Sequence, residues 1–157
     1  MNDPHPNKTP FAGILAILDE PSDKAPAGAR GHRVILTRRA AEDALWSLKG
    51  MGVNVVPGGG KHEAKKKVGV IDYAEIIGKE IHVRGYLFGW DMPEVVSTLQ
   101  AAAEPWGMSY ELHDSSVDDM RAAVYVISAC IFTGAAIMPL DKVAYQKTKF
   151  YFVQAEK

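Results

Sequence analysis

Residues 68–90 have the sequence VGVIDYAEIIGKEIHVRGYLFGW, and this stretch decides the fold. Two apolar runs, 68–77 and 80–90, flank Gly78-Lys79, a composition typical of the tight turn between two antiparallel strands. Within the second run, apolar positions alternate with polar or aromatic ones (Ile81, Val83, Gly85 and Leu87 against His82, Arg84 and Tyr86). This period of two predicts a β-hairpin with one buried face.

Further strands and helices are predicted on both sides of the hairpin. Strand-like segments are Phe11–Leu18, Arg33–Leu36, Gly107–His113, Lys149–Val153 and Ala123–Met138, the last being long or bent with a break near Gly134. Residues 53–56 form an apolar run. Helices are predicted at Arg38–Lys49 with Thr37 as its cap, from Asp91 to before Pro105 with a capping-box-like start, and as a turn within 141–147. We expect the polar stretch Asp114–Arg121 to be a loop.

These elements predict an α+β fold: a mainly antiparallel, partly closed β-barrel flanked by two or three helices. Residues 1–10 carry three prolines and no periodicity, so we expect a flexible tail there. The rest, 11–157, is long enough for a single domain with its own core.

Composition excludes several classes of function. Eighteen basic residues balance 19 acidic ones, which argues against a dedicated nucleic-acid binder. No apolar run reaches the ~18 residues of a membrane span. The histidines and the single cysteine, Cys130, show no metal-ligand spacing, and Gly58-Gly59-Gly60 is not followed by the Gly-Lys-Ser/Thr of a phosphate loop. We therefore expect no metal, no cofactor and no membrane partner.

Two short segments carry the candidate chemistry. Lys61-His62-Glu63 precedes the hairpin, and Gly107-Met108-Ser109-Tyr110-Glu111 lies within a later strand. If folding brings His62 to Ser109, a weak hydroxyl lies beside a base that can take its proton, as nucleophilic catalysis requires. On these residues alone, a solvated loop histidine and a strand serine facing solvent remain open. The lysines around His62 lack interleaved aromatics, which favours a solvated loop over a specific nucleic-acid site.

In this order, the segments resemble the prohead (capsid maturation) proteases of tailed bacteriophages, serine proteases distantly similar to the herpesvirus assemblins. The resemblance covers roughly residues 60–138. It rests on His62, Val68-Gly69-Val70-Ile71, the strand 81–88, the helical segment 93–99 and Gly107-Met108-Ser109.

The resemblance implies a protease-like domain with Ser109 as nucleophile and His62 as general base. It also implies phage scaffold and major capsid proteins as substrates, a location in the host cytoplasm inside the procapsid, and compatibility with a homo-oligomer. Such enzymes are often fused to a scaffolding segment, so a chain ending at Lys157 fits a protease domain separated from one.

One position departs from the family pattern. Thr133 stands where the family has the carboxylate that orients the histidine, so the resemblance makes it the third catalytic candidate. Its hydroxyl can accept a hydrogen bond from the imidazole N–H but carries no charge to stabilise an imidazolium. Substitutes on or next to the nucleophile strand are Glu111, His113 and Asp114, at places that suit the role less naturally than Thr133. Two alternatives stay open: a catalytically silent relative acting as a capsid-assembly or scaffold-core module, and a small α+β binding domain unrelated to phage.

Overall fold

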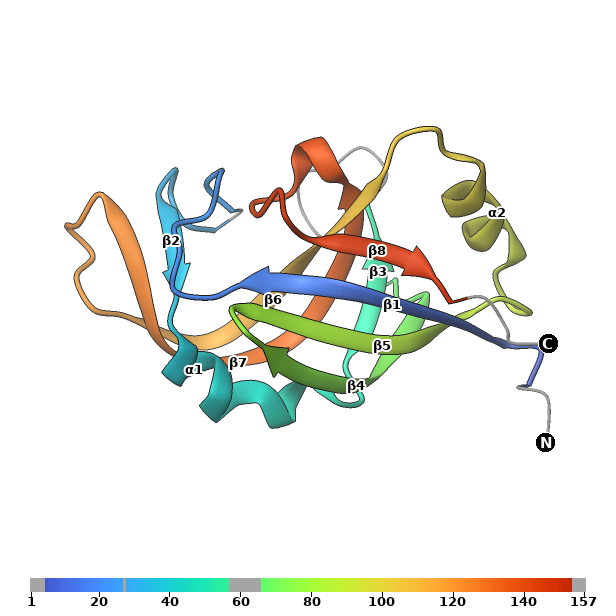
Figure 1. Cartoon of the computed structure of the whole chain (residues 1–157), viewed down its shortest axis with the longest axis horizontal. Coiled ribbons are helices and arrows are strands. Elements are labelled where there is room, and N and C mark those ends of the chain that lie inside the picture. The colour runs from blue at the N-terminus through green and yellow to red at the C-terminus, as the bar shows by residue number, and fades with distance from the viewer. Residues whose placement is uncertain (1–4, 27, 57–65, 154–157) are drawn as a thin grey trace.

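The computed structural model describes residues 5–26, 28–56 and 66–153. Within them, eight strands form one sheet that curls into a half-barrel (Figure 1). The sheet order is β2-β7-β3-β4-β5-β1-β8, with β6 paired to β7. The bounds are β1 Lys8–Ile17, β2 Arg33–Leu36, β3 Gly52–Val55, β4 Gly69–Ile77, β5 Glu80–Phe88, β6 Trp106–Val117, β7 Val124–Pro139 and β8 Lys149–Phe152. The predicted partly closed, mainly antiparallel α+β fold is confirmed.

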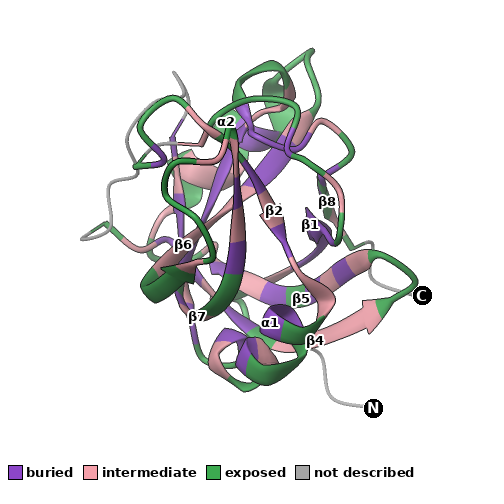
Figure 2. Cartoon of the chain, turned by 90° about the vertical axis from the view of Figure 1, so that its left-hand side faces the viewer, coloured by how far each residue is buried: buried purple, intermediate pink, exposed green. Residues whose placement is uncertain are grey.

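The predicted hairpin is strands β4 and β5. They pair antiparallel from Gly69↔Leu87 to Ile77↔Glu80, and Gly78 makes the turn with a φ of 60°, a conformation that favours glycine. Buried residues alternate with less buried ones along β5 (Figure 2), and Ile81, Val83 and Leu87 belong to the main core. β5 also pairs along its other edge with β1, which begins at Lys8, three residues earlier than predicted.

Helix α1, Arg38–Ala44, begins where predicted, because Thr37 Oγ1 accepts a hydrogen bond from the amide of Ala40 at 3.1 Å. The chain then continues as a 3-10 helix over Leu45–Leu48. The buried alanines of α1 belong to the main core, and the helix packs against β7. Helix α2, Pro93–Ala101, lies at the opposite end of the molecule (Figure 1).

Two local predictions were wrong. The start of α2 has no capping box, because Met92 is the N-cap residue and the Asp91 carboxylate instead accepts a hydrogen bond from Asn7 Nδ2 at 3.0 Å. The segment 114–117 is not a loop but the end of β6, which reaches Val117. Its polar residues are exposed at the end of the hairpin that β6 forms with β7. Both faces of the sheet meet solvent there, so polar side chains are compatible with a strand.

The long strand β7 is bent, as predicted, and organises the region of the site. It pairs with β6 along one edge and, in parallel, with β2 and then β3 along the other. The ladder with β6 is interrupted between Glu111 and Leu112, which leaves Thr133 as an extra residue in β7 between Phe132 and Gly134. This β-bulge is the break expected near Gly134.

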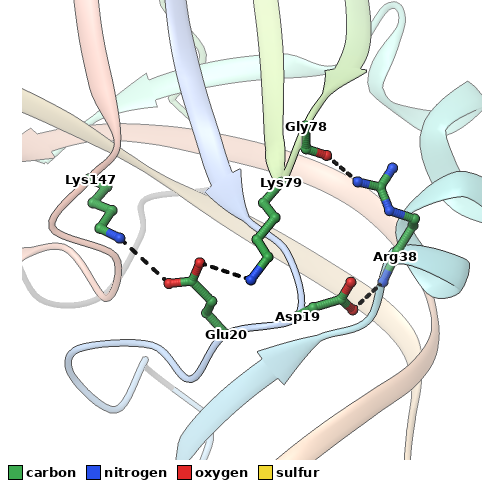
Figure 3. Close-up of polar contacts among 6 residues, drawn as sticks. All are labelled: Asp19, Glu20, Arg38, Gly78, Lys79 and Lys147. Atoms are coloured by element: carbon green, nitrogen blue, oxygen red, sulfur yellow. Dashed lines mark hydrogen bonds and ion pairs between the residues drawn. The ribbon is translucent and has the colours of Figure 1, made fainter.

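A cluster of charged residues joins one end of β1 to the β4–β5 turn (Figure 3). Glu20 lies between Lys79 and Lys147, with N–O distances of 3.4 and 3.5 Å, and the Arg38 guanidinium donates to the carbonyl of Gly78. These exposed pairs contribute little to stability individually. In the described residues, no helix is long and apolar enough to cross a membrane.

Candidate active site

Ser109 lies on β6, half-buried, opposite Ala136 of β7, and Ala136 in turn lies opposite Asn54 of β3. Residues directly opposite one another in a sheet point to the same face. Asn54, Ala136 and Ser109 therefore form a row across three strands. This face is not that of the main core: Ala136 packs in a second, smaller apolar cluster with Val56, Met138 and Val143.

Glu111 stands two residues beyond Ser109 on β6, so its side chain points to the same face. Its opposite residue is Gly134. A Cβ placed on Gly134 would collide with Glu111 Oε2 and would lie 2.9 Å from Glu111 Cδ and 3.1 Å from Lys67 Nζ. The missing side chain of Gly134 thus leaves the space beside which the Glu111 carboxylate and the Lys67 Nζ both lie.

Lys67 reaches this point from the segment before β4. A Cβ on Gly52 of β3 would lie 2.7 Å from Lys67 Cδ, so a second glycine makes room for the stem of the lysine. Within the part of the chain that the structure describes, Lys67 Nζ is buried without a hydrogen-bond partner. The amide nitrogen and oxygen of Asn54 are buried and unpartnered in the same sense. Unpaired buried polar atoms are rare in folded proteins and tend to mark functional places.

Of the three residues that the sequence proposes for catalysis, the structure describes Ser109 and Thr133. Ser109 lies on this polar face. Thr133 is exposed at the bulge. His62 lies outside the described residues, so its encounter with Ser109 remains a prediction. Of the other substitutes for the carboxylate, His113 and Asp114 are exposed, and Asp114 has a positive φ of 50°.

A pocket of about 510 Å³ lies along β6 beside Ser109. A volume of this size falls in the range of ligand-binding pockets. Its lining combines six residues of β6 with the loop before β2, one residue of β2 and the first half of β7: Pro26, Gly28, Ala29, Val34, Ser109, Tyr110, Glu111, Leu112, Ser115, Val117, Tyr125 and Ile127.

Tyr110 of β6 forms a pair with Tyr145, which lies in the segment before β8. The hydroxyls of Tyr110 and Tyr145 are 3.1 Å apart, and Tyr110 packs edge-on against Phe132. Burial raises the pKa of Tyr110 well above its usual value, and it raises the pKa of Tyr145 to about 12. Both phenols are therefore neutral at physiological pH and serve as packing and hydrogen-bonding groups beneath the site.

Sequence reasoning missed the parts of the site that depend on pairing across strands. Asn54 gave no signal within the apolar run 53–56. Lys67 was assigned to a solvated lysine run, although its Nζ is buried. Gly134 was recognised as a break in a strand but not as the space for a carboxylate. Among the described residues, no group of three or more histidine, cysteine, aspartate or glutamate side chains could hold a metal ion.

The curled half-barrel, with its serine on the strand beside the bent β7, has the fold of the viral capsid-assembly proteases. Two solved structures carry this conclusion. The capsid assembly protease gp21 of bacteriophage T4 is similar over 83% of this chain and 96% of its own, with a TM-score of 0.53 and 12% identity. KSHV protease, solved with a hexapeptide phosphonate inhibitor, is similar over 94% of this chain and 66% of its own, with a TM-score of 0.55 and 10% identity.

The resemblance predicted from the sequence, to phage prohead proteases and more distantly to herpesvirus assemblin, is confirmed by these two structures. No family model matches the chain. No curated protein is similar to it in sequence. At 10–12% identity the two solved structures establish the fold, and the roles of individual residues must be argued from the chain itself.

Proposed function

We propose that the protein is a phage capsid maturation serine protease that cleaves scaffold and capsid proteins during procapsid assembly, inside the procapsid in the host cytoplasm. The observation that carries the proposal is the position of Ser109. It lies beside a pocket and on a sheet face with Asn54, Glu111 and Lys67, in a fold similar to that of two viral proteases.

The proposed reaction is acyl transfer. Ser109 Oγ attacks the scissile carbonyl while His62, the base that the sequence suggests, takes the hydroxyl proton. The tetrahedral intermediate collapses to an acyl-enzyme as the base returns that proton to the leaving amine. A water molecule then attacks the ester by the same route and releases the new carboxyl end with Ser109 restored.

The pocket along β6 supports a peptide substrate. The pocket runs along residues 109–112 of β6. Among the described residues β6 pairs with β7 along one edge, and no strand pairs with its other edge. A peptide can bind such a strand in extended form through its backbone, with side chains entering a neighbouring pocket. We propose that the pocket receives a substrate side chain close to the scissile bond.

The rival function is a catalytically silent capsid-assembly module. Its support is Thr133, which is exposed and uncharged at the position where the resemblance places a carboxylate. Removal of the orienting charge reduces the rate on the order of 10⁴-fold in a well-characterised serine protease triad. A silent relative would keep the fold and lose reactivity at Ser109.

Labelling with a peptidyl phosphonate separates the two functions, because this probe bonds covalently only to an activated hydroxyl. We expect mass spectrometry to find a single adduct on Ser109 and none in Ser109→Ala. Ser116→Ala changes an exposed serine of the same strand and should label like the unchanged protein. His62→Ala should slow labelling strongly. A folded protein that does not label, or a Ser109→Ala variant that labels normally, would reject the protease and favour the silent module.

A further inference from the structure

We propose that Glu111 supplies the carboxylate that orients the general base of the Ser109 site, in place of the carboxylate missing at position 133. This inference rests on the proposed function and assigns Glu111 as a positioning residue. It is carried by the placement of Ser109, Glu111 and Gly134 on neighbouring strands.

The spacing along β6 suits this role. Residues two apart on a strand are about 7 Å apart and point to the same face. An imidazole that bonds a hydroxyl through one nitrogen and a carboxylate through the other holds the two oxygens roughly 7–8 Å apart. The positions of Ser109 and Glu111 along β6 are therefore spaced about as far apart as the two oxygens that one imidazole bridges.

Gly134 explains how the carboxylate reaches the right part of the sheet from the opposite strand. It neighbours Thr133 in β7 and faces Glu111 across the ladder. Any side chain at position 134 would occupy the space that Glu111 Oε2 and Cδ fill. With glycine there, the carboxylate lies over β7 next to the position where the family pattern has its own acid. The negative charge is kept, but it comes from β6 instead of β7.

Among the described residues, Lys67 is a basic residue that lies near this carboxylate, because its Nζ is close to the same point above Gly134. A purely structural Glu111–Lys67 contact is the competing explanation, and it predicts a loss of stability with no change in the pH dependence of the reaction.

The test is Glu111→Gln, which keeps the shape of the side chain and removes its charge. The readout is the second-order rate of phosphonate labelling at Ser109 between pH 5 and 9. We expect the rate at pH 7 to fall at least 100-fold. The acidic limb of the profile should move to lower pH, because a nearby negative charge favours the protonated base. Glu75→Gln, at a half-buried glutamate of β4, should change neither.

Gly134→Ala tests the same idea without touching Glu111. Its Cβ collides with the carboxylate, so labelling should slow to a similar extent while circular dichroism shows a folded protein. If Glu111→Gln and Gly134→Ala label at the unchanged rate with the unchanged pH profile, the inference is overturned. The proposed protease function then still stands, provided that Ser109→Ala fails to label. The role of Glu111 and the protease function are therefore tested separately.

Discussion

Asn54 and Ser109 stand in one row of the sheet, on either side of Ala136, and the side chain of Asn54 is fully buried. Its amide has no hydrogen-bond partner in the described part of the chain. Leaving such a group unpaired lowers stability by about 1–3 kcal/mol. Asn54 thus lowers the stability of the protein and lies in the same row as the proposed nucleophile. Such destabilising residues are typical of functional sites, where stability is traded for activity.

The first prediction concerns this residue. Asn54→Val should raise the free energy of unfolding by about 1–3 kcal/mol, because it removes two buried, unpaired polar atoms from a strand. Urea denaturation followed by tryptophan fluorescence measures the change. Asn7→Val is the matched control: Asn7 Oδ1 accepts hydrogen bonds from the amides of Trp90 and Asp91, so this variant should be less stable. A less stable Asn54→Val protein would mean that the amide is paired after all.

The second prediction is loss of stability in alkali, from the tyrosine pair under the site. The pKa of Tyr145 is raised by burial from 10.0 to about 12 in the folded protein. A folded-state pKa above the unfolded value means that the protonated phenol stabilises the fold. This contribution is complete below pH 10 and is lost as the pH rises from 10 to about 12. Two pKa units correspond to about 3 kcal/mol.

Urea denaturation at pH 7, 10 and 11.5 should therefore show a falling free energy of unfolding. Tyr145→Phe should flatten this dependence, with a loss of about 1 kcal/mol at pH 7 from the missing hydrogen bond to Tyr110. Tyr151→Phe, at an exposed tyrosine of β8, should leave the slope unchanged. An unaltered slope in Tyr145→Phe would assign the alkaline transition to other groups.

Local patterns in the sequence predicted most of the elements. The β4–β5 hairpin was predictable because Gly78 and a strict alternation of apolar residues encode it locally. The end of β6 was not: its polar residues resemble a loop, and only their pairing with β7 makes them a strand. The start of α2 was mispredicted for a related reason, since a distant residue, Asn7, binds the Asp91 side chain that a capping box would have used.

The candidate site also combines local and long-range features. Ser109 was proposed from its own segment, because the Gly-Met-Ser sequence is contiguous. The relation of Glu111 to Gly134 depends on the β6–β7 register, which includes a bulge at Thr133 that shifts every pairing beyond it. The family pattern, followed along the sequence, places the third proposed catalytic group at Thr133, whose side chain is exposed in the structure.

The third prediction concerns the cap of α1. Thr37 Oγ1 accepts from the amide of Ala40 and also donates to the carbonyl of Ile127 in β7, so it ties the helix to the sheet. Thr37→Ala should lower the free energy of unfolding by about 1–2 kcal/mol. Thr37→Ser keeps the hydroxyl and should stay within about 0.5 kcal/mol of the unchanged protein. Equal stability of the alanine variant would show that the cap contributes nothing.

The fourth prediction concerns Cys130, the only cysteine of the chain. Burial raises the pKa of its thiol to about 11, so the reactive thiolate is scarce at neutral pH. At pH 8 the folded protein should react with a disulfide reagent such as DTNB at least about 100-fold more slowly than free cysteine. The rate should climb with pH up to about 11.

Unfolding in guanidinium supplies the control for this measurement, because the exposed thiol should then react at the rate of free cysteine. The result also bears on the labelling experiments, because a slowly reacting Cys130 competes little with Ser109 for an electrophilic probe at pH 7. Fast reaction of the folded protein at pH 8 would contradict the prediction. It would mean that β7 opens locally near Cys130, on the strand that holds Gly134 and Ala136 in place.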